Sequence, residues 1–179
     1  MKSVYIFRGA PATGKGTVVP AFIKLLPTPA ALITEDTFRW DFHLASRTIQ
    51  DVTDDEHMFA YRNMVRIYEE YLKNGTYTIV LEGLFTWDDM RSSQGSAREL
   101  AEIARTHGFT VRSIVLKADK KELLKRNKLR NYSVPVDEFN QLYANVYKTV
   151  ADEEMVIDST HQTAEQTLET LKHLASLGT

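Results

Sequence analysis

Nine consecutive residues near the start of the chain have the types and the spacing of a phosphate-binding loop. Residues 9–17 read GAPATGKGT, in which four residues separate Gly9 from Gly14 and Lys15 follows directly. Glycines let backbone N–H groups turn inward around an anion, and the helix that follows adds the positive end of its dipole. Lys15 adds a mobile positive charge for the β- and γ-phosphates of a nucleotide. The residues expected to contact the nucleotide are Gly9, Ala12, Thr13, Gly14, Lys15, Gly16 and Thr17.

One position of this loop bears on the metal ion. Gly16 follows Lys15, where many such loops carry a serine or threonine that ligates Mg²⁺. The GKGT form resembles that of adenylate kinases and related small kinases, in which the metal is held largely through water. The resemblance implies Mg²⁺ with few protein ligands, of which Thr17 is the expected one, mostly through water.

A second group of reactive side chains follows a short apolar run at residues 30–33. Glu35 and Asp36 follow it after Thr34, and Arg39 lies one helical turn further on. Ligands collect beyond the carboxyl ends of the strands in a parallel sheet, so these acids are expected near the γ-phosphate. A carboxylate there orients an acceptor hydroxyl and takes its proton, and Arg39 holds a polar or negative group of the acceptor. From residue type alone, capping of the next helix is an equally good interpretation.

A basic segment is the third candidate. Between positions 112 and 130 there are two acids and eight basic residues, namely Arg112, Lys117, Lys120, Lys121, Lys125, Arg126, Lys128 and Arg130. Residues 119–130 are predicted to be helical, and their spacing of four places Arg126 and Arg130 on one face. Arginines brought onto the transferring phosphoryl group would stabilise its growing charge. A solvated charged helix is the alternative interpretation.

Apolar runs alternate with amphipathic stretches along the whole chain. The predicted strands are residues 3–7, 30–33, 76–81, 111–116 and 155–157. Between them lie helical stripes, two of which begin at predicted capping boxes, Thr53 to Glu56 and Ser96 to Glu99. Strands that alternate with helices indicate a parallel sheet covered on both faces, an α/β fold in one domain of residues 1–179.

Composition limits the classes of function. The 179 residues carry a formal net charge of −2, which argues against a protein that mainly coats nucleic acid or an anionic membrane. The sequence has no cysteine, so disulfides, thiolate metal sites and cysteine nucleophiles are excluded. Its five histidines lack metal-ligand spacing. With no membrane-spanning run and no signal-peptide core, a cytoplasmic location is expected.

The combination of residues 9–17, the segment Asp36 to Arg39 and the basic segment 124–130 resembles known phosphotransferases. It is similar to P-loop kinases of the polynucleotide 5′-hydroxyl kinase, zeta-toxin-like and chloramphenicol-phosphotransferase-like group, within the AAA-type P-loop NTPases. The resemblance implies a nucleoside-monophosphate-kinase-like three-layer sandwich, with a five-stranded parallel sheet and a helical lid at about residues 120–137. It assigns Asp36 as the base and Arg39 as the acceptor-binding arginine. Glu82 stands where members often carry Asp, and it is expected to bind a metal-bound water or an acceptor group, or to be a plain acid at a strand end.

The expected activity is therefore transfer of the γ-phosphoryl group of ATP, with Mg²⁺, to a hydroxyl or phosphate of a small molecule or nucleotide. The expected catalytic residues are Lys15, Asp36, Arg126 and Arg130. The alternatives are a polynucleotide 5′-hydroxyl kinase and a nucleotide-binding domain without catalysis. Four aromatic residues are candidates either for an acceptor pocket or for helix packing, namely Trp40, Phe42, Phe85 and Trp87.

Overall fold

The computed structural model describes residues 2–40, 52–88 and 94–176. Its centre is a five-stranded sheet in the order β2-β3-β1-β4-β5, and every neighbouring pair is parallel. The strands are β1 (Ser3–Arg8), β2 (Ala30–Thr34), β3 (Thr78–Gly83), β4 (Thr110–Lys117) and β5 (Met155–Asp158). The parallel sheet predicted from the alternation of strands and helices is confirmed.

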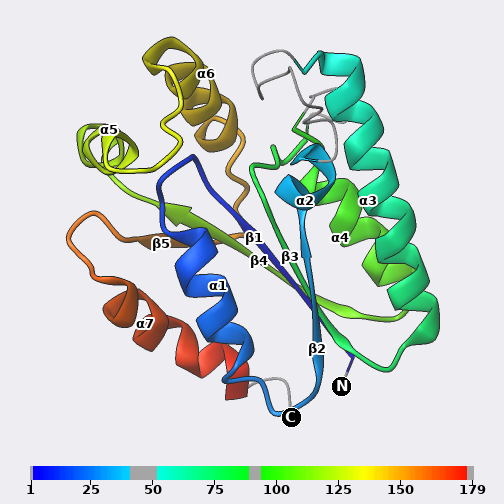
Figure 1. The fold of residues 1–179 in the computed structure, drawn as a ribbon. Coiled ribbons are helices and arrows are strands. Elements are labelled where there is room, and N and C mark those ends of the chain that lie inside the picture. The colour runs from blue at the N-terminus through cyan, green and yellow to red at the C-terminus, as the bar shows by residue number, and fades with distance from the viewer. Residues whose placement is uncertain (1, 41–51, 89–93, 177–179) are drawn as a thin grey trace.

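Helices cover both faces of the sheet and its carboxyl edge (Figure 1). They are α1 (Lys15–Ile23), α2 (Glu35–Trp40), α3 (Asp54–Asn74), α4 (Ala97–Thr106), α5 (Lys120–Lys128), α6 (Val136–Tyr147) and α7 (Ala164–Ser176). The helices α1 and α7 lie on one face, α3 and α4 lie on the other, and α5 and α6 stand beyond the carboxyl ends of the strands. None of the helices in the described ranges is both long and apolar enough to cross a membrane.

The residues of β1 show how the sheet joins the two helical layers. Val4 and Ile6 belong to the core shared with α3 and α4, whereas Tyr5 and Phe7 pack among residues of α1 and α7. Successive side chains of a strand point to opposite faces, and here both faces are apolar. All four side chains are fully buried. The strand that precedes residues 9–17 is therefore fixed in the middle of the core.

Two local predictions, one on a strand and one on a capping box, need correction. The strand predicted at residues 76–81 is found at Thr78–Gly83, so Glu82 lies within β3 and does not follow it. The box at Thr53 forms in both directions, but at Ser96 only the hydroxyl accepts from the Glu99 N–H. The carboxylate of Glu99 instead accepts a hydrogen bond from the Tyr61 hydroxyl at 2.8 Å. Local sequence could not predict this partner, because Tyr61 belongs to α3.

The basic helix is also shorter than predicted. It ends at Lys128, so Arg126 lies in its last turn while Arg130 lies beyond it, and the two do not share a helical face. Asn127 explains the ending: its side chain donates to the carbonyl of Val134 at 2.8 Å and accepts from the Val134 N–H at 3.1 Å. These two bonds close the chain into a tight loop over residues 128–133.

Candidate functional site

The sheet order places residues 9–17 at the centre of the carboxyl edge. They follow β1, which has β3 on one side and β4 on the other. Two loop residues adopt left-handed backbone conformations, Ala12 with φ 64° and Gly14 with φ 90°. Glycine takes this conformation freely, but alanine pays about 1 kcal/mol for it. The surrounding structure therefore holds the loop in a shape that the chain would not choose locally, as is common at ligand sites.

The start of α1 is open to an anion. Its cap residue is Gly14, no side-chain hydrogen bond caps the helix, and its first turn contains no acid. The start of α3 is the opposite case, because the Thr53 hydroxyl and three acids fill its first turn. Backbone N–H groups at a helix start and the positive end of the dipole attract anions. Both the geometry and the charge at the start of α1 fit a phosphate group.

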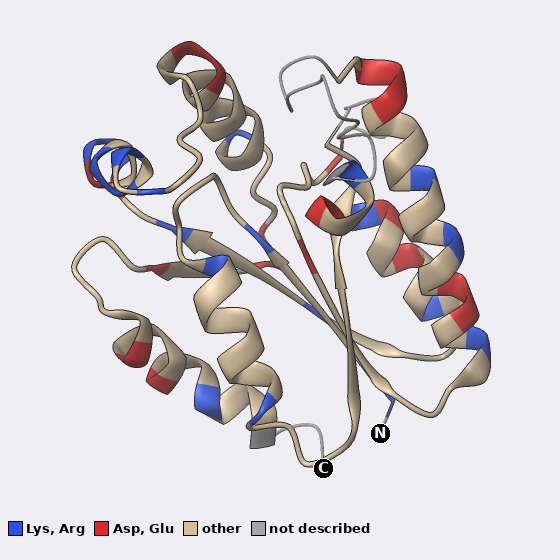
Figure 2. Ribbon diagram, viewed as in Figure 1, with Lys and Arg blue, Asp and Glu red and all other residues tan. Residues whose placement is uncertain are grey.

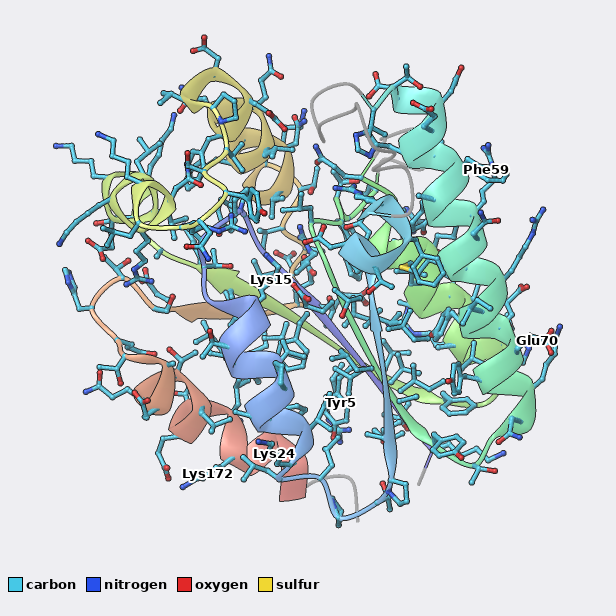
Figure 3. The ribbon with its side chains drawn as sticks, in the orientation of Figure 1. Tyr5, Lys15, Lys24, Phe59, Glu70 and Lys172 are labelled. Atoms are coloured by element: carbon cyan, nitrogen blue, oxygen red, sulfur yellow. The ribbon has the colours of Figure 1, made fainter. Side chains whose placement is uncertain are left out.

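Lys15 is folded into the loop (Figure 3). Its ammonium group donates to the carbonyl of Gly9 at 2.7 Å and to that of Ala10 at 3.2 Å, and the residue is 8% exposed. Burial lowers the pKa of Lys15, while the charges of Glu82 and Asp36 oppose this effect. A cation held on carbonyl oxygens in this way can turn to a bound phosphate without leaving the loop.

Two acids stand beside Lys15. Glu82 pairs in register with Phe7 of β1 and with Thr34 of β2, so the sheet itself sets its position. Burial raises the pKa of Glu82, Lys15 lowers it, and Asp36 raises it. Asp36 is exposed in the first turn of α2. The sheet and α2 thus bring Lys15, Asp36 and Glu82 into one electrostatic group, although Glu82 lies within β3 and does not follow it.

Glu35 and Arg39 form a buried ion pair next to this group. The Arg39 guanidinium donates to Glu35 Oε1 at 2.5 Å, and the backbone N–H of Leu84 donates to Oε2 at 2.8 Å. Burial raises the pKa of Glu35 to about 7, with Arg39 acting in the opposite direction. Arg39, expected to hold an acceptor group, therefore has its charge engaged by a residue of its own helix.

Arg126 borders a cavity of about 260 Å³ beside the loop. The other walls are Ala12, Thr13, Gly14, Thr17 and the segment that joins β5 to α7. The Arg126 guanidinium donates to Glu122 at 2.9 Å and to the carbonyls of Ser159 and Thr160 at 3.0 and 3.1 Å. Three hydrogen-bonded groups thus hold Arg126 in place between α5 and that segment.

Arg130 has a different environment. It is exposed, and its charge acts on Lys15, whose pKa it lowers. In Figure 2 much of the ribbon of α5 is blue, and this helix stands near the loop that follows β1. The two arginines predicted for the lid therefore differ. Arg126 is held by hydrogen bonds, whereas Arg130 is exposed and its charge acts on Lys15.

Sequence reasoning missed two residues that support the loop. The hydroxyl of Tyr147 accepts from the Ala10 N–H at 3.3 Å and donates to the carbonyl of Leu116 at 2.8 Å. Arg8, which directly precedes the loop, is fully buried and ion-paired with Glu154. A charged residue at the end of an apolar strand was a visible signal that Arg8 needed a partner. Nothing in the local sequence identified Glu154 as the partner of Arg8 or Tyr147 as the partner of Ala10.

The aromatic candidates divide cleanly. Phe85 and Trp87 are buried in the core beneath α3 and α4, at 0% and 6% exposure, so packing is the correct interpretation for both. The side chain of Trp40 and the whole of Phe42 lie outside the described residues.

Comparison with known proteins gives the family. A profile of the AAA domain family matches residues 4–150. The chain belongs to this family. No curated protein matches the chain in sequence.

Solved structures show the same fold at low sequence identity. A sugar kinase from Janibacter sp. HTCC2649 is 17% identical, with 97% of this chain and 95% of that chain covered and a TM-score of 0.66. A gluconokinase from Sinorhizobium meliloti 1021 is 18% identical, with 98% of this chain and 94% of that chain covered and a TM-score of 0.62. A chain of the Pnkp1/Rnl/Hen1 RNA repair complex is 17% identical, with 83% of this chain but 45% of that chain covered and a TM-score of 0.61. The chain thus has the nucleoside-monophosphate-kinase-like α/β fold of P-loop kinases, as the sequence predicted.

Proposed function

We propose that the protein is a phosphotransferase that moves the γ-phosphoryl group of ATP to a hydroxyl or phosphate of a small-molecule or nucleotide acceptor. The observation that carries the proposal is the position of Lys15. Its ammonium group lies inside a loop with an open helix start, next to Asp36 and Glu82. A phosphate-binding cation beside a carboxylate is what transfer to a hydroxyl requires.

In the proposed reaction the acceptor oxygen forms a bond to the γ-phosphorus, and the bond from that phosphorus to the β–γ bridging oxygen breaks. Asp36 receives the hydroxyl proton, and ADP leaves with the bridging oxygen. Lys15 and the loop N–H groups hold the phosphates, Arg39 and Glu82 border the acceptor, and Arg126 and Arg130 belong to a lid over residues 120–137. Both arginines come from the segment that stands beyond the loop in Figure 1.

The residues present fit Mg²⁺ only as an ion carried with the nucleotide. No group of three or more metal-ligating side chains is found in the described part of the chain. Thr17 is exposed at the start of α1 and is the residue proposed to reach the ion, mostly through water. When bound, Mg²⁺ would neutralise charge on the β- and γ-phosphates.

Replacement of the lysine at each end of α1 tests the proposal. Lys15→Ala should lower kcat/KM for phosphoryl transfer from labelled ATP by about 10²–10³-fold, because it removes a charge aimed at the transferring group. Lys24, exposed at the other end of α1 (Figure 3), is the matched control, and Lys24→Ala should leave transfer unchanged. Equal turnover in the two variants would reject residues 9–17 as the phosphate site.

A further inference from the structure

The ion pair between Glu35 and Arg39 is built into the fold and is not a surface contact. The side chains are 1% and 8% exposed. Glu35 is held from two directions, since Arg39 belongs to its own helix and the Leu84 N–H comes from the end of β3. Gly83 leaves the room for this approach, because a Cβ at that position would lie 2.5 Å from Glu35 Oε2.

This arrangement decides what charge Arg39 presents to an acceptor. An arginine recognises phosphate or carboxylate when its charge is available in a bidentate geometry. Above about pH 7 Glu35 is ionised, and its carboxylate then neutralises that charge. The guanidinium is also almost wholly covered. Burying two charges is costly, and such pairs are often retained for specificity and not for stability. The pair therefore removes positive charge from the place where an anionic acceptor would need it.

The neighbouring groups add negative charge. Asp36 and Glu82 lie beside Lys15, whose own charge serves the ATP phosphates in the proposed reaction. Burial lowers the pKa of His57 of α3, and the charge of Arg39 lowers it further, so a positive charge on this ring is disfavoured. The first turn of α3, at the top of Figure 2, is acidic. An acceptor with its own negative charge would be repelled by this set.

We infer that the Glu35–Arg39 pair makes this a site for acceptors without an anionic group near the receiving hydroxyl. The substrate class is uncharged or amine-bearing polyhydroxy compounds, as opposed to phosphorylated or carboxylated ones and nucleic-acid ends. The inference rests on the proposed phosphotransferase function and narrows its acceptor.

A panel of matched acceptors tests the substrate class with the unaltered protein. The panel contains a hexose, its amino sugar and its sugar acid, then a nucleoside, its 3′-monophosphate and a 5′-hydroxyl oligonucleotide. Transfer of labelled γ-phosphate to the neutral or amine-bearing member of a set should exceed that to the anionic member by at least about tenfold in kcat/KM, one ion contact being worth about that much. An anionic member that is equal or better would overturn the inference, as would oligonucleotide phosphorylation that weakens steeply with salt.

Two variants test the role of Glu35 itself. Glu35→Gln leaves the charge of Arg39 without its carboxylate, so the ratio of anionic to neutral acceptor use should rise by about tenfold. The double variant Glu35→Gln, Arg39→Gln removes both charges, and its ratio should return toward the original. A ratio that is the same in all three proteins would overturn the assignment of Glu35. If either variant fails to fold, the acceptor panel still decides the substrate class.

Titration with ATP separates this inference from the proposed function. If ATP does not bind, the phosphotransferase proposal fails. If ATP binds and Lys15-dependent transfer goes to anionic acceptors, only the acceptor class is wrong. If ATP binds and no neutral or amine-bearing member receives phosphate, the acceptor class is rejected as well.

Discussion

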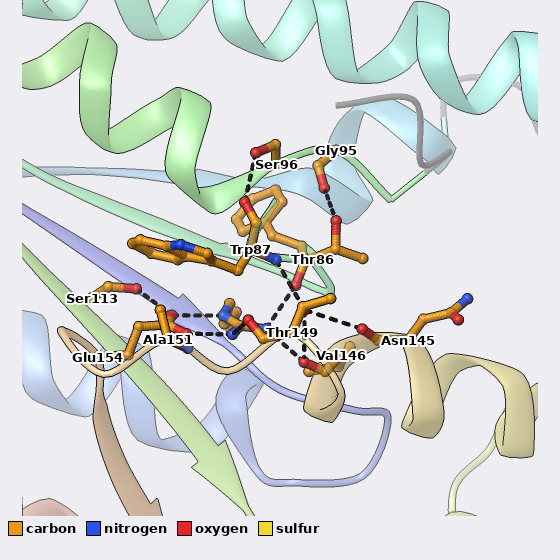
Figure 4. Close-up of polar contacts among 12 residues, drawn as sticks. Thr86, Trp87, Gly95, Ser96, Ser113, Asn145, Val146, Thr149, Ala151 and Glu154 are labelled. Carbon is orange, nitrogen blue, oxygen red and sulfur yellow. Dashed lines mark hydrogen bonds and ion pairs between the residues drawn. The ribbon is translucent and has the colours of Figure 1, made fainter. Parts of the chain in front are cut away.

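Arg8 and Glu154 form an ion pair in which neither side chain is exposed, although 146 positions separate them in the chain. The Arg8 guanidinium also donates to the carbonyls of Val146 and Thr149 at 2.8 and 3.1 Å. Glu154 accepts from the Ser113 hydroxyl at 2.8 Å and from the Ala151 N–H at 3.0 Å. Figure 4 shows these contacts at the junction of α6, β4 and the turn before β5. The charges are thus fully hydrogen-bonded inside the protein.

Glu154→Gln should destabilise the protein by about 3–5 kcal/mol, because it leaves the Arg8 charge buried without its partner. The double variant Arg8→Met, Glu154→Leu removes both charges and should cost less than the single one. Urea unfolding measures both values. A single variant that costs no more than the double would show that the pair is not coupled.

Tyr147→Phe should loosen the phosphate loop. Burial raises the pKa of Tyr147, so its hydroxyl stays protonated and continues to donate to Leu116. Without the hydroxyl, the Ala10 N–H and the Leu116 carbonyl lose a partner, at a cost of about 1–3 kcal/mol. The free energy of unfolding should fall by this amount, and the dissociation constant for ATP should rise several-fold. The control is Tyr143→Phe, since the Tyr143 hydroxyl makes no hydrogen bond to a described residue, and it should change neither quantity.

Asp36→Asn should lower kcat by about 10²–10⁴-fold and leave ATP affinity unchanged, because a proton acceptor acts in the transition state. Single-turnover transfer and equilibrium ATP binding measure the two quantities. Asp152→Asn, an exposed change far along the chain, serves as the control. A loss of ATP affinity with normal kcat would move Asp36 from the acceptor side to the nucleotide side.

The two arginines of the proposed lid should respond differently to replacement. Arg130 is exposed, so Arg130→Ala should slow transfer without changing the Tm. Arg126 is 27% exposed and bound to Glu122 and two carbonyls, so Arg126→Ala should also lower the free energy of unfolding by about 1 kcal/mol. Lys128→Ala is the exposed control in the same segment. Identical thermal and kinetic effects of the two arginine variants would contradict this division.

Glu35 should make stability depend on pH. The pKa of its carboxyl is about 7 in the folded protein against an ordinary 4.5, so the folded state holds this proton more tightly than the unfolded chain does. The stabilisation is complete below about pH 4.5 and is lost as the pH rises through about 7. Relative to Glu35→Gln, the free energy of unfolding should therefore fall by up to about 3 kcal/mol over that range. Glu70→Gln, at an exposed position, is the control and is measured in the same way. A flat difference for Glu35→Gln would contradict the raised pKa.

Local sequence was sufficient for features that neighbouring residues determine. The loop spacing around Lys15, the capping box at Thr53 and the end of α3 at Gly75, with φ 67°, all follow from contacts within a few positions. The alternation of strands and helices likewise indicated the parallel sheet, because that connection rule holds across proteins.

The remaining features depend on which strands are neighbours. The partner of Arg8 comes from the turn before β5, and the loop is held by Tyr147 from α6. Glu35 looked like a helix cap, but its second oxygen accepts from Leu84 once β2 lies beside β3. No local pattern distinguishes a capping acid from one that is ion-paired inside the fold. The same limit explains why Arg126 and Arg130 were placed on one face, since the contact of Asn127 with Val134 ends the helix early.

The contacts of Arg8 and Tyr147 also constrain how the proposed lid could move. Both fasten the last residues of α6 to the central strand and to the loop that follows it. Val136, the first residue of α6, is 54% exposed, whereas Phe139 one turn further on is fully buried with Ala10, Ala118 and Leu123. A swing of α5 and α6 in the proposed lid would therefore pivot near residues 146–149 and would have to be small to keep Phe139 packed. The 12 residues of α6 give a lever of about 18 Å, so a rotation of a few degrees at the pivot shifts the residue 128–133 loop by only an ångström or two.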